Sequence, residues 1–256
     1  MIHWSRVGTF LLCSAIGIVL WGRVLWLCDE KLSTIRQLVF FAMGRTRLQM
    51  GEMRSLILSA IYYAVGLLLA LLLTTAFGLP PSQFVFVKVN DVFYVVLGII
   101  GEISLATLLV QIGAIAIGER GPQRFAEVSK IPWIKGLRAL PPQIVPLVAA
   151  VAGAVEEFFF RGVVLGILAW KLYVPPPLAI VIAGGLFCVQ QLLQIRTPFQ
   201  AVVILSGCIS ISIVGGLLVV IQGSVVPAIL CHASFVVFFM AQNSQRRQQA
   251  GAAAGQ

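Results

Sequence analysis

The chain has 256 residues, of which 59% are hydrophobic and only 11% are charged. This composition excludes a soluble globular protein and indicates a membrane protein that crosses the bilayer several times. The net charge of +9 does not indicate nucleic-acid binding, because the positions of the basic residues have a simpler explanation in membrane topology.

Hydropathy predicts an all-α fold, a polytopic membrane helical bundle of about seven transmembrane helices of roughly 20 residues each. The predicted spans are residues 7–28, 55–78, 92–118, 143–170, 178–195, 199–221 and 225–241. Of the 18 Lys and Arg residues, two lie within spans and sixteen lie outside them, thirteen on one side of the membrane and three on the other. This positive-inside bias places the N-terminus outside and the C-terminus in the cytoplasm.

Two connecting segments, residues 29–54 and 120–138, each mix Arg and Lys with large apolar side chains. We predict that both are interfacial amphipathic segments that lie among the lipid headgroups and contact anionic lipid. A gate over a cytoplasmic opening is the alternative for them. The tail, residues 242–256, is rich in Gln, Ala and Gly and is expected to be disordered.

The fourth predicted span carries three charged residues, Glu156, Glu157 and Arg161, in a stretch that is otherwise apolar from residue 144 to 170. A charged residue at the bilayer centre raises the free energy of membrane insertion by at least about 2.5–3.5 kcal/mol, so three of them in one helix indicate a structural or functional role. Glu157 and Arg161 are four residues apart, share one helix face and can neutralise each other. Glu156 points about 100° away and has no partner in its own helix, so it is available as a general base or acid. A purely structural ion pair between helices is the alternative.

Three other spans also carry polar residues. They are Glu102 in the third span, Gln190, Gln191 and Gln194 after Phe187 in the fifth, and His232 in the seventh. Each has an ordinary structural explanation, because Gln often bridges membrane helices by hydrogen bonds and a lone His is more often a satisfied core residue. Glu102 is predicted to pair with Arg23 or with a Gln.

We predict that these spans converge so that Glu156, Glu157, Arg161, Gln191 and His232 face one interior cavity. This convergence would build one polar chamber that is closed to lipid and can hold water for attack on a peptide bond. Zinc is poorly supported, because a catalytic zinc ion usually takes three protein ligands and His232 is the one His within a predicted span. We therefore expect no metal ion and no cofactor.

Three motifs give residues 140–240 a resemblance to a known family. Glu156, Glu157 and Arg161 form the pattern Glu-Glu-x-x-x-Arg, and Phe187 begins a Phe-x-x-x-His pattern in which Gln191 replaces the His. His232 begins a His-x-x-x-Asn pattern in which Val replaces the Asn or Asp at position 236. This part of the chain resembles the CPBP family of membrane proteases, which includes CAAX prenyl endopeptidases and bacteriocin-processing, lysostaphin-resistance-A-like proteins.

The resemblance implies a glutamate-type intramembrane endopeptidase, in a bacterial plasma (inner) membrane, that cleaves a membrane-associated peptide or protein. Its partners would be membrane lipid and that substrate, with no nucleic acid. Glu156 would activate water, His232 would polarise the water or support the oxyanion, and Gln191 would donate a hydrogen bond to the oxyanion. The supporting residues would be Glu157, Arg161, Gln190 and Phe187.

The same resemblance divides the chain into an N-terminal membrane region of about three spans and two basic segments (1–139), a CPBP-like core of about four spans (140–241) and the tail (242–256). A catalytically impaired member that acts as a membrane scaffold or binds a partner is the alternative function, because Gln191 cannot exchange a proton near neutral pH and Val236 offers no polar group. A transporter or channel is disfavoured, because the sequence shows no internal repeat.

Overall fold

The computed structural model describes residues 4–30, 33–46, 48–88, 91–118 and 125–239, and these residues form helices joined by short turns, with no strand among them. The helices are α1 (Trp4–Glu30), α2 (Ser33–Met43), α3 (Met50–Phe77), α4 (Asp91–Ala116), α5 (Phe125–Val128), α6 (Pro132–Ala139), α7 (Val145–Glu157), α8 (Pro176–Leu192), α9 (Pro198–Gln222) and Val226–Phe239, named here the His232 helix. A 3-10 turn, Pro81–Gln83, follows α3. The predicted all-α fold is confirmed.

Each predicted span has a helix at its place. The helices α1 (over Trp4–Val24), α3, α4 and α9 are long and apolar enough to cross a membrane. The fourth span is α7 with its π-helical continuation, and α8 and the His232 helix are shorter apolar helices. The lengths and composition of these helices fit an integral membrane protein.

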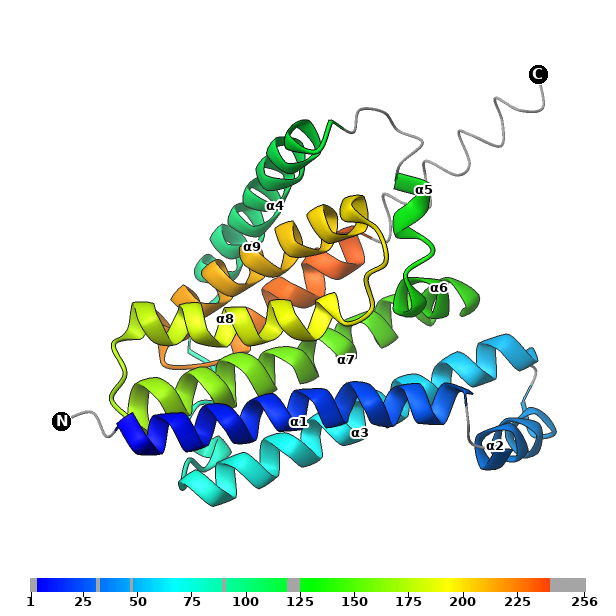
Figure 1. Cartoon of the computed structure of the whole chain (residues 1–256), viewed down its shortest axis with the longest axis horizontal. Helices are drawn as coiled ribbons and strands as arrows, with labels where there is room; N and C mark the ends of the chain where they lie inside the picture. The colour runs from blue at the N-terminus through cyan, green and yellow to red at the C-terminus, as the bar shows by residue number, and fades with distance from the viewer. Residues whose placement is uncertain (1–3, 31–32, 47, 89–90, 119–124, 240–256) are drawn as a thin grey trace.

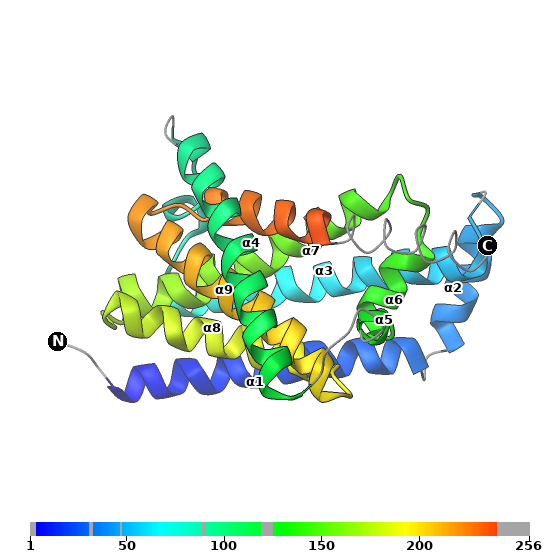
Figure 2. The same ribbon diagram turned by 90° about the horizontal axis from the view of Figure 1, so that it is seen from above.

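The long helices form two sets with different directions. The helices α1, α3, α7 and α8 run side by side along the long axis of the molecule, whereas α4 and α9 cross them obliquely (Figure 1 and Figure 2). Helix α9 packs against both α4 and α8, and α3 packs against α1 and α7. The fourth span therefore lies between helices from both halves of the chain.

Local signals in the sequence explain where the helices begin and end. Helix α3 begins at a capping box in which the backbone N–H of Gln49 donates to the carboxylate of Glu52 (2.6 Å), and α9 begins at Thr197, whose hydroxyl accepts from the backbone N–H of Gln200 (3.3 Å). Both helices end at a glycine in the left-handed region, Gly78 and Gly223. This conformation at the C-cap is one that residues with a Cβ rarely adopt.

The predicted interfacial segments each contain a short helix. Helix α2 exposes Leu38, Phe40 and Phe41, whereas α6 buries Ile134 and Leu137 against the bundle. Helices α2, α5 and α6 all lie at the same end of the bundle (Figure 1), as expected for segments assigned to one membrane face.

The core of the bundle is centred on the helix that carries the charged motif. After Glu157 this helix widens into π-helical turns over Phe158–Leu165 and Ile167–Lys171. Side chains of Phe159, Phe160 and Val163 are fully buried there. Because π-helical turns occur frequently at functional sites, the residues next to these turns are candidates for a functional site.

We expect Gly66→Ala to destabilise the fold, because Gly66 allows α1 and α7 to approach α3 closely. A Cβ at this position would lie 2.4 Å from the ring of Trp21 and 2.8 Å from Val155. Overpacking of this kind costs about 1–3 kcal/mol, and thermal unfolding in detergent measures it. Gly51→Ala in the same helix is the control, because a Cβ there meets no atom within 4 Å. Equal stability of the two variants would contradict the packing described.

Candidate functional site

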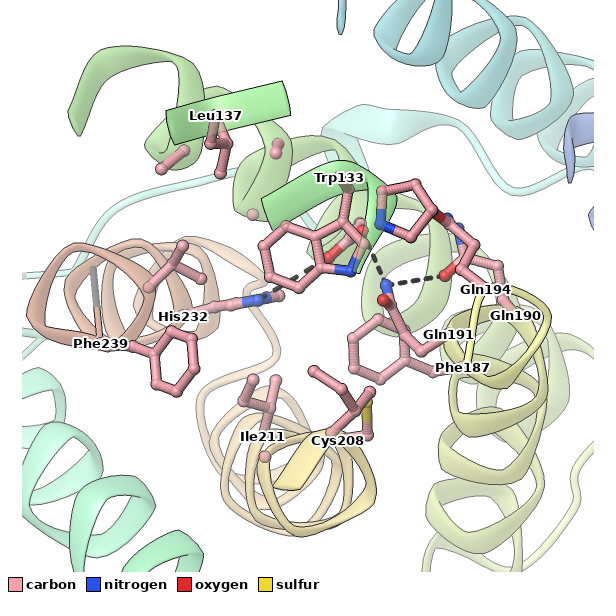
Figure 3. Close-up of a pocket in the computed structure, with 18 of the residues that line it drawn as sticks. Trp133, Leu137, Phe187, Gln190, Gln191, Gln194, Cys208, Ile211, His232 and Phe239 are labelled. Atoms are coloured by element: carbon pink, nitrogen blue, oxygen red, sulfur yellow. Dashed lines mark hydrogen bonds and ion pairs between the residues drawn. The ribbon is translucent and has the colours of Figure 1, made fainter. Parts of the chain in front are cut away.

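A cavity of about 1040 Å³ lies inside the bundle and receives polar side chains from several helices. Glu156 from α7 lines it. Gln190, Gln191 and Phe187 from α8 and His232 line it as well (Figure 3). Small-molecule pockets usually measure about 300–1,000 Å³, so this cavity has room for a peptide segment. The predicted convergence of Glu156, Gln191 and His232 is confirmed, whereas their chemical roles stay predictions.

Two of the predicted site residues, Glu157 and Arg161, do not line the cavity. They lie behind His232 and are 0% and 1% exposed. The prediction that they face the cavity with Glu156 is therefore wrong. The rotation of about 100° per helical residue that turns Glu156 toward the cavity turns Glu157 away from it.

Glu157 joins two charged or polar partners through a single oxygen atom. Its Oε1 lies 3.0 Å from a guanidinium nitrogen of Arg161, which is the predicted ion pair, and 2.9 Å from Nδ1 of His232. An ionised carboxylate can only accept hydrogen bonds, so Nδ1 of His232 carries the hydrogen. This contact fixes the orientation of the imidazole ring and directs Nε2 toward the cavity.

Arg161 is itself held by residues of two other helices. Its second guanidinium nitrogen donates to the hydroxyl of Ser212 on α9 (3.0 Å). The guanidinium carbon lies 4.6 Å from the ring centroid of Phe187 on α8, a cation–π geometry. The ring of Phe187 also lies 6.0 Å from that of His232, so one aromatic side chain contacts both members of the network.

Glu156 faces the free nitrogen of the imidazole. Its Oε2 lies 3.8 Å from Nε2 of His232, which is longer than a direct hydrogen bond. A water molecule can lie about 2.8 Å from both atoms, a normal hydrogen-bond distance, because these two distances and the 3.8 Å separation close a triangle. The two side chains can therefore hold one water between them at the cavity wall.

The other oxygen of Glu156 belongs to a closed ring of hydrogen bonds. Oε1 accepts from the hydroxyl of Tyr62 on α3 and from Nε2 of Gln191 (3.0 Å). Gln191 also donates to Oε1 of Gln190 (2.9 Å), and Nε2 of Gln190 donates to the Tyr62 hydroxyl (2.8 Å). Glu156 has no ion pair in its own helix, as predicted, but one of its oxygens is fixed by two other helices.

The ring of hydrogen bonds limits what Gln191 can do. A side-chain amide has two N–H groups, and those of Gln191 are occupied by Glu156 and Gln190. To reach a developing oxyanion, the amide has to release one of these contacts.

Glu102 on α4 does not have the predicted partner. The side chain is fully buried, and neither carboxylate oxygen has a hydrogen bond to any residue that the structure describes. The predicted pairing with Arg23 or a Gln is therefore wrong. Helix α4 packs against α9, and Glu102 interacts electrostatically with His232, Glu157 and Arg161.

Sequence reasoning did not assign Tyr62 or Trp133 to the cavity wall. Tyr62 contacts Glu156 directly, and the buried indole N–H of Trp133 has no hydrogen-bond partner among the residues that the structure describes. Val236, which the sequence pattern did single out, lines the cavity with an apolar side chain. A signal for Tyr62 was present, because a Tyr-Tyr pair stands in the middle of an apolar span, whereas Tyr usually prefers the membrane interface.

The donor set gives no reason to assign a metal site. Within the residues that the structure describes, no three His, Cys, Asp or Glu side chains are grouped to hold a metal ion. The described cysteines, including Cys208 on the cavity wall, carry free thiols. Independence of metal ions stays a prediction.

The comparison with protein families places this site in a known context. Residues 139–238 match the family model of type II CAAX prenyl endopeptidase Rce1-like proteins. The matched segment contains Glu156, Gln191 and His232, and the resemblance to CPBP membrane proteases is confirmed over it. Neither curated proteins nor solved structures gave a match. Tyr62, Glu102 and Trp133 lie outside the matched residues.

We expect Arg161→Ala to destabilise the protein strongly, because it leaves Glu157 buried without its counter-charge. Breaking a buried ion pair by removing one partner typically costs about 3–5 kcal/mol. Glu156→Gln should spare folding, because its side-chain carbonyl can still accept from Tyr62 and Gln191. Membrane yield and thermal unfolding in detergent measure both variants. An equal loss of stability in the two would show that the ion pair does not have this structural role.

Proposed function

We propose that the chain is a glutamate-type intramembrane endopeptidase that hydrolyses a peptide bond in a membrane-associated peptide or protein. The observation that carries this proposal is the 3.8 Å separation of Glu156 Oε2 and His232 Nε2 at the wall of a cavity of about 1040 Å³. The family match of residues 139–238 supports it. A base, an oriented imidazole and space for water and substrate are the parts that metal-free peptide hydrolysis requires.

In the proposed reaction, Oε2 of Glu156 removes a proton from the water as the water oxygen bonds to the carbonyl carbon. The electron pair of the C=O double bond moves to the carbonyl oxygen and forms a tetrahedral oxyanion. When this intermediate collapses, the C–N bond breaks and the protonated Glu156 transfers its proton to the leaving nitrogen. The products are a carboxylic acid and an amine, and Glu156 returns to its starting state.

His232 and the residues behind it prepare the site for this step. Nε2 of His232 orients the water, and Nδ1 is held by Glu157 at 2.9 Å. If the imidazole takes up a proton, the Glu157 carboxylate stabilises that charge without moving. Arg161 limits the movement of Glu157, since its guanidinium is fixed by Ser212 and Phe187. These residues therefore support the geometry of the reacting atoms.

We further propose that the substrate enters from the bilayer of a bacterial plasma membrane, with the N-terminus of the enzyme outside and its C-terminus in the cytoplasm. The distribution of basic residues supports this orientation. The proposed boundary near residue 139 rests on the sequence alone. Tyr62 and Trp133 precede this boundary and also line the cavity.

A non-catalytic relative that acts as a membrane scaffold or binds a partner is the second candidate. Val236 favours it, because this apolar side chain lines the cavity at the position where the family pattern has Asn or Asp. The occupied amide of Gln191 points the same way. Loss of one oxyanion donor lowers a rate by about 10²–10³, so a direct assay of cleavage separates the two functions.

We expect Glu156→Gln to abolish cleavage, because an amide cannot remove a proton from water. Cleavage is measured in cells against membrane-anchored reporters that carry a prenylated C-terminus, a leader peptide or a sorting tail, with membrane levels checked by blot. Glu52→Gln is the matched control, since Glu52 caps α3 away from the cavity and Gln can still cap. Full cleavage by Glu156→Gln would refute the proposed chemistry.

We expect Gln191→Ala to lose more activity than Gln191→His. Alanine removes the hydrogen bond to Glu156 and leaves no donor for an oxyanion, whereas His restores a donor that can exchange protons. The loss in Gln191→Ala should reach about 10²–10³-fold in rate. Equal activity of both variants and the wild type, at equal membrane levels, would remove Gln191 from the mechanism.

A further inference from the structure

The N-terminal part of the chain reaches the proposed catalytic carboxylate through Tyr62. The Tyr62 hydroxyl donates to Oε1 of Glu156 and accepts from Nε2 of Gln190 (2.8 Å). Tyr62 stands on α3, 94 residues before Glu156, and lies outside the residues that match the protease family. The family patterns therefore assign no function to it.

The position of the Tyr62 ring is determined by α1 as well as by α3. The indole N–H of Trp21 donates to the backbone carbonyl of Tyr62 (3.1 Å), and the two ring centroids lie 4.7 Å apart. Trp21 is fully buried and also packs edge-on against Phe159 in the π-helical turn (5.4 Å). Because three helices fix the aromatic pair, the hydroxyl is presented to Glu156 in a defined direction.

The hydrogen bonds at Glu156 are distributed unequally between its two oxygens. Oε1 accepts from Tyr62 and Gln191, whereas Oε2 faces His232. The carboxylate cannot rotate without breaking the hydrogen bonds at Oε1, so Oε2 keeps its position facing His232. The proton of the attacking water is therefore directed to Oε2, the atom that lies beside the imidazole.

We infer that Tyr62 is a positioning residue of the hydrolytic site. With Gln191, its hydroxyl holds Oε1 of Glu156, so that Oε2 is the basic atom that faces the water and His232. This inference rests on the proposed function and deepens it, because it names a polar group that the N-terminal region adds to the site.

Tyr62 also explains how a site with Gln191 and Val236 stays polar and ordered. Where the family pattern has a second His and an Asn or Asp, this chain has an amide whose two hydrogens are occupied and an aliphatic side chain. The Gln190–Gln191 pair closes its ring of hydrogen bonds only through the Tyr62 hydroxyl. The orientation of Glu156 then depends on α3 and α8 together.

The test compares Tyr62→Phe with Tyr63→Phe. Both variants lose one hydroxyl from the cavity wall, but the Tyr63 hydroxyl donates to the backbone carbonyl of Val148 (2.6 Å) rather than to Glu156. Misplacement of a reacting group by about 1 Å can lower a rate by about 100-fold. We expect Tyr62→Phe to lower kcat by about tenfold to a hundredfold with little change in KM, and Tyr63→Phe to stay near the wild type.

A second readout separates positioning from a merely structural role. Fluorotyrosines with increasingly acidic hydroxyls are placed at position 62. Across this series kcat should change steadily with the acidity of the phenol, whereas the same series at position 63 should leave kcat unchanged. Wild-type kcat in Tyr62→Phe, or equal losses in both Phe variants, would overturn the inference.

Infrared spectroscopy tests the contact without a substrate. The difference between wild type and Glu156→Gln isolates the carboxyl band of Glu156, which should shift in Tyr62→Phe and not in Tyr63→Phe. An unshifted band would overturn the inference about Tyr62. Absence of cleavage by the wild type, together with a shifted band, would instead overturn the proposed hydrolysis and leave the contact intact.

Discussion

The site depends on one buried carboxylate, that of Glu157, which binds Arg161 in its own helix and His232 in another. A guanidinium in a membrane bundle is very costly without a counter-charge, and Glu157 supplies that charge at 3.0 Å. The same oxygen then orients the imidazole at 2.9 Å. A single atom, Oε1 of Glu157, therefore both neutralises Arg161 and orients His232.

Helix packing determines whether these contacts can form. Arg161 reaches Ser212 on α9 and the ring of Phe187 on α8, so both helices must approach the π-helical turn closely. Gly184 allows α8 and α9 to do so, because a Cβ there would lie 2.8 Å from the Cβ of Ser212. Small residues at helix contacts are how membrane helices bring their backbones together, and here such a contact also positions a partner of the buried guanidinium.

Much of this arrangement could be predicted from the sequence, because its signals are local. The apolar runs predicted the helices, and the four-residue spacing of Glu157 and Arg161 predicted the ion pair. Contacts between distant segments could not be predicted in the same way. Tyr62 reaches Glu156 only because Trp21, Gly66 and Val155 bring α1, α3 and α7 together. The pairing predicted for Glu102 failed for the same reason, since no local pattern shows which helix α4 will face.

The protonation of His232 tests the central claim most directly. Histidine labelled with ¹⁵N is measured by solid-state NMR in lipid bilayers, and a His3→Gln background leaves a single histidine, because the chain has two. We expect hydrogen on Nδ1, in a hydrogen bond to a carboxylate, and a clear change of this signal in Glu157→Gln. Hydrogen on Nε2 alone, or a spectrum that Glu157→Gln leaves unchanged, would contradict the role given to Glu157.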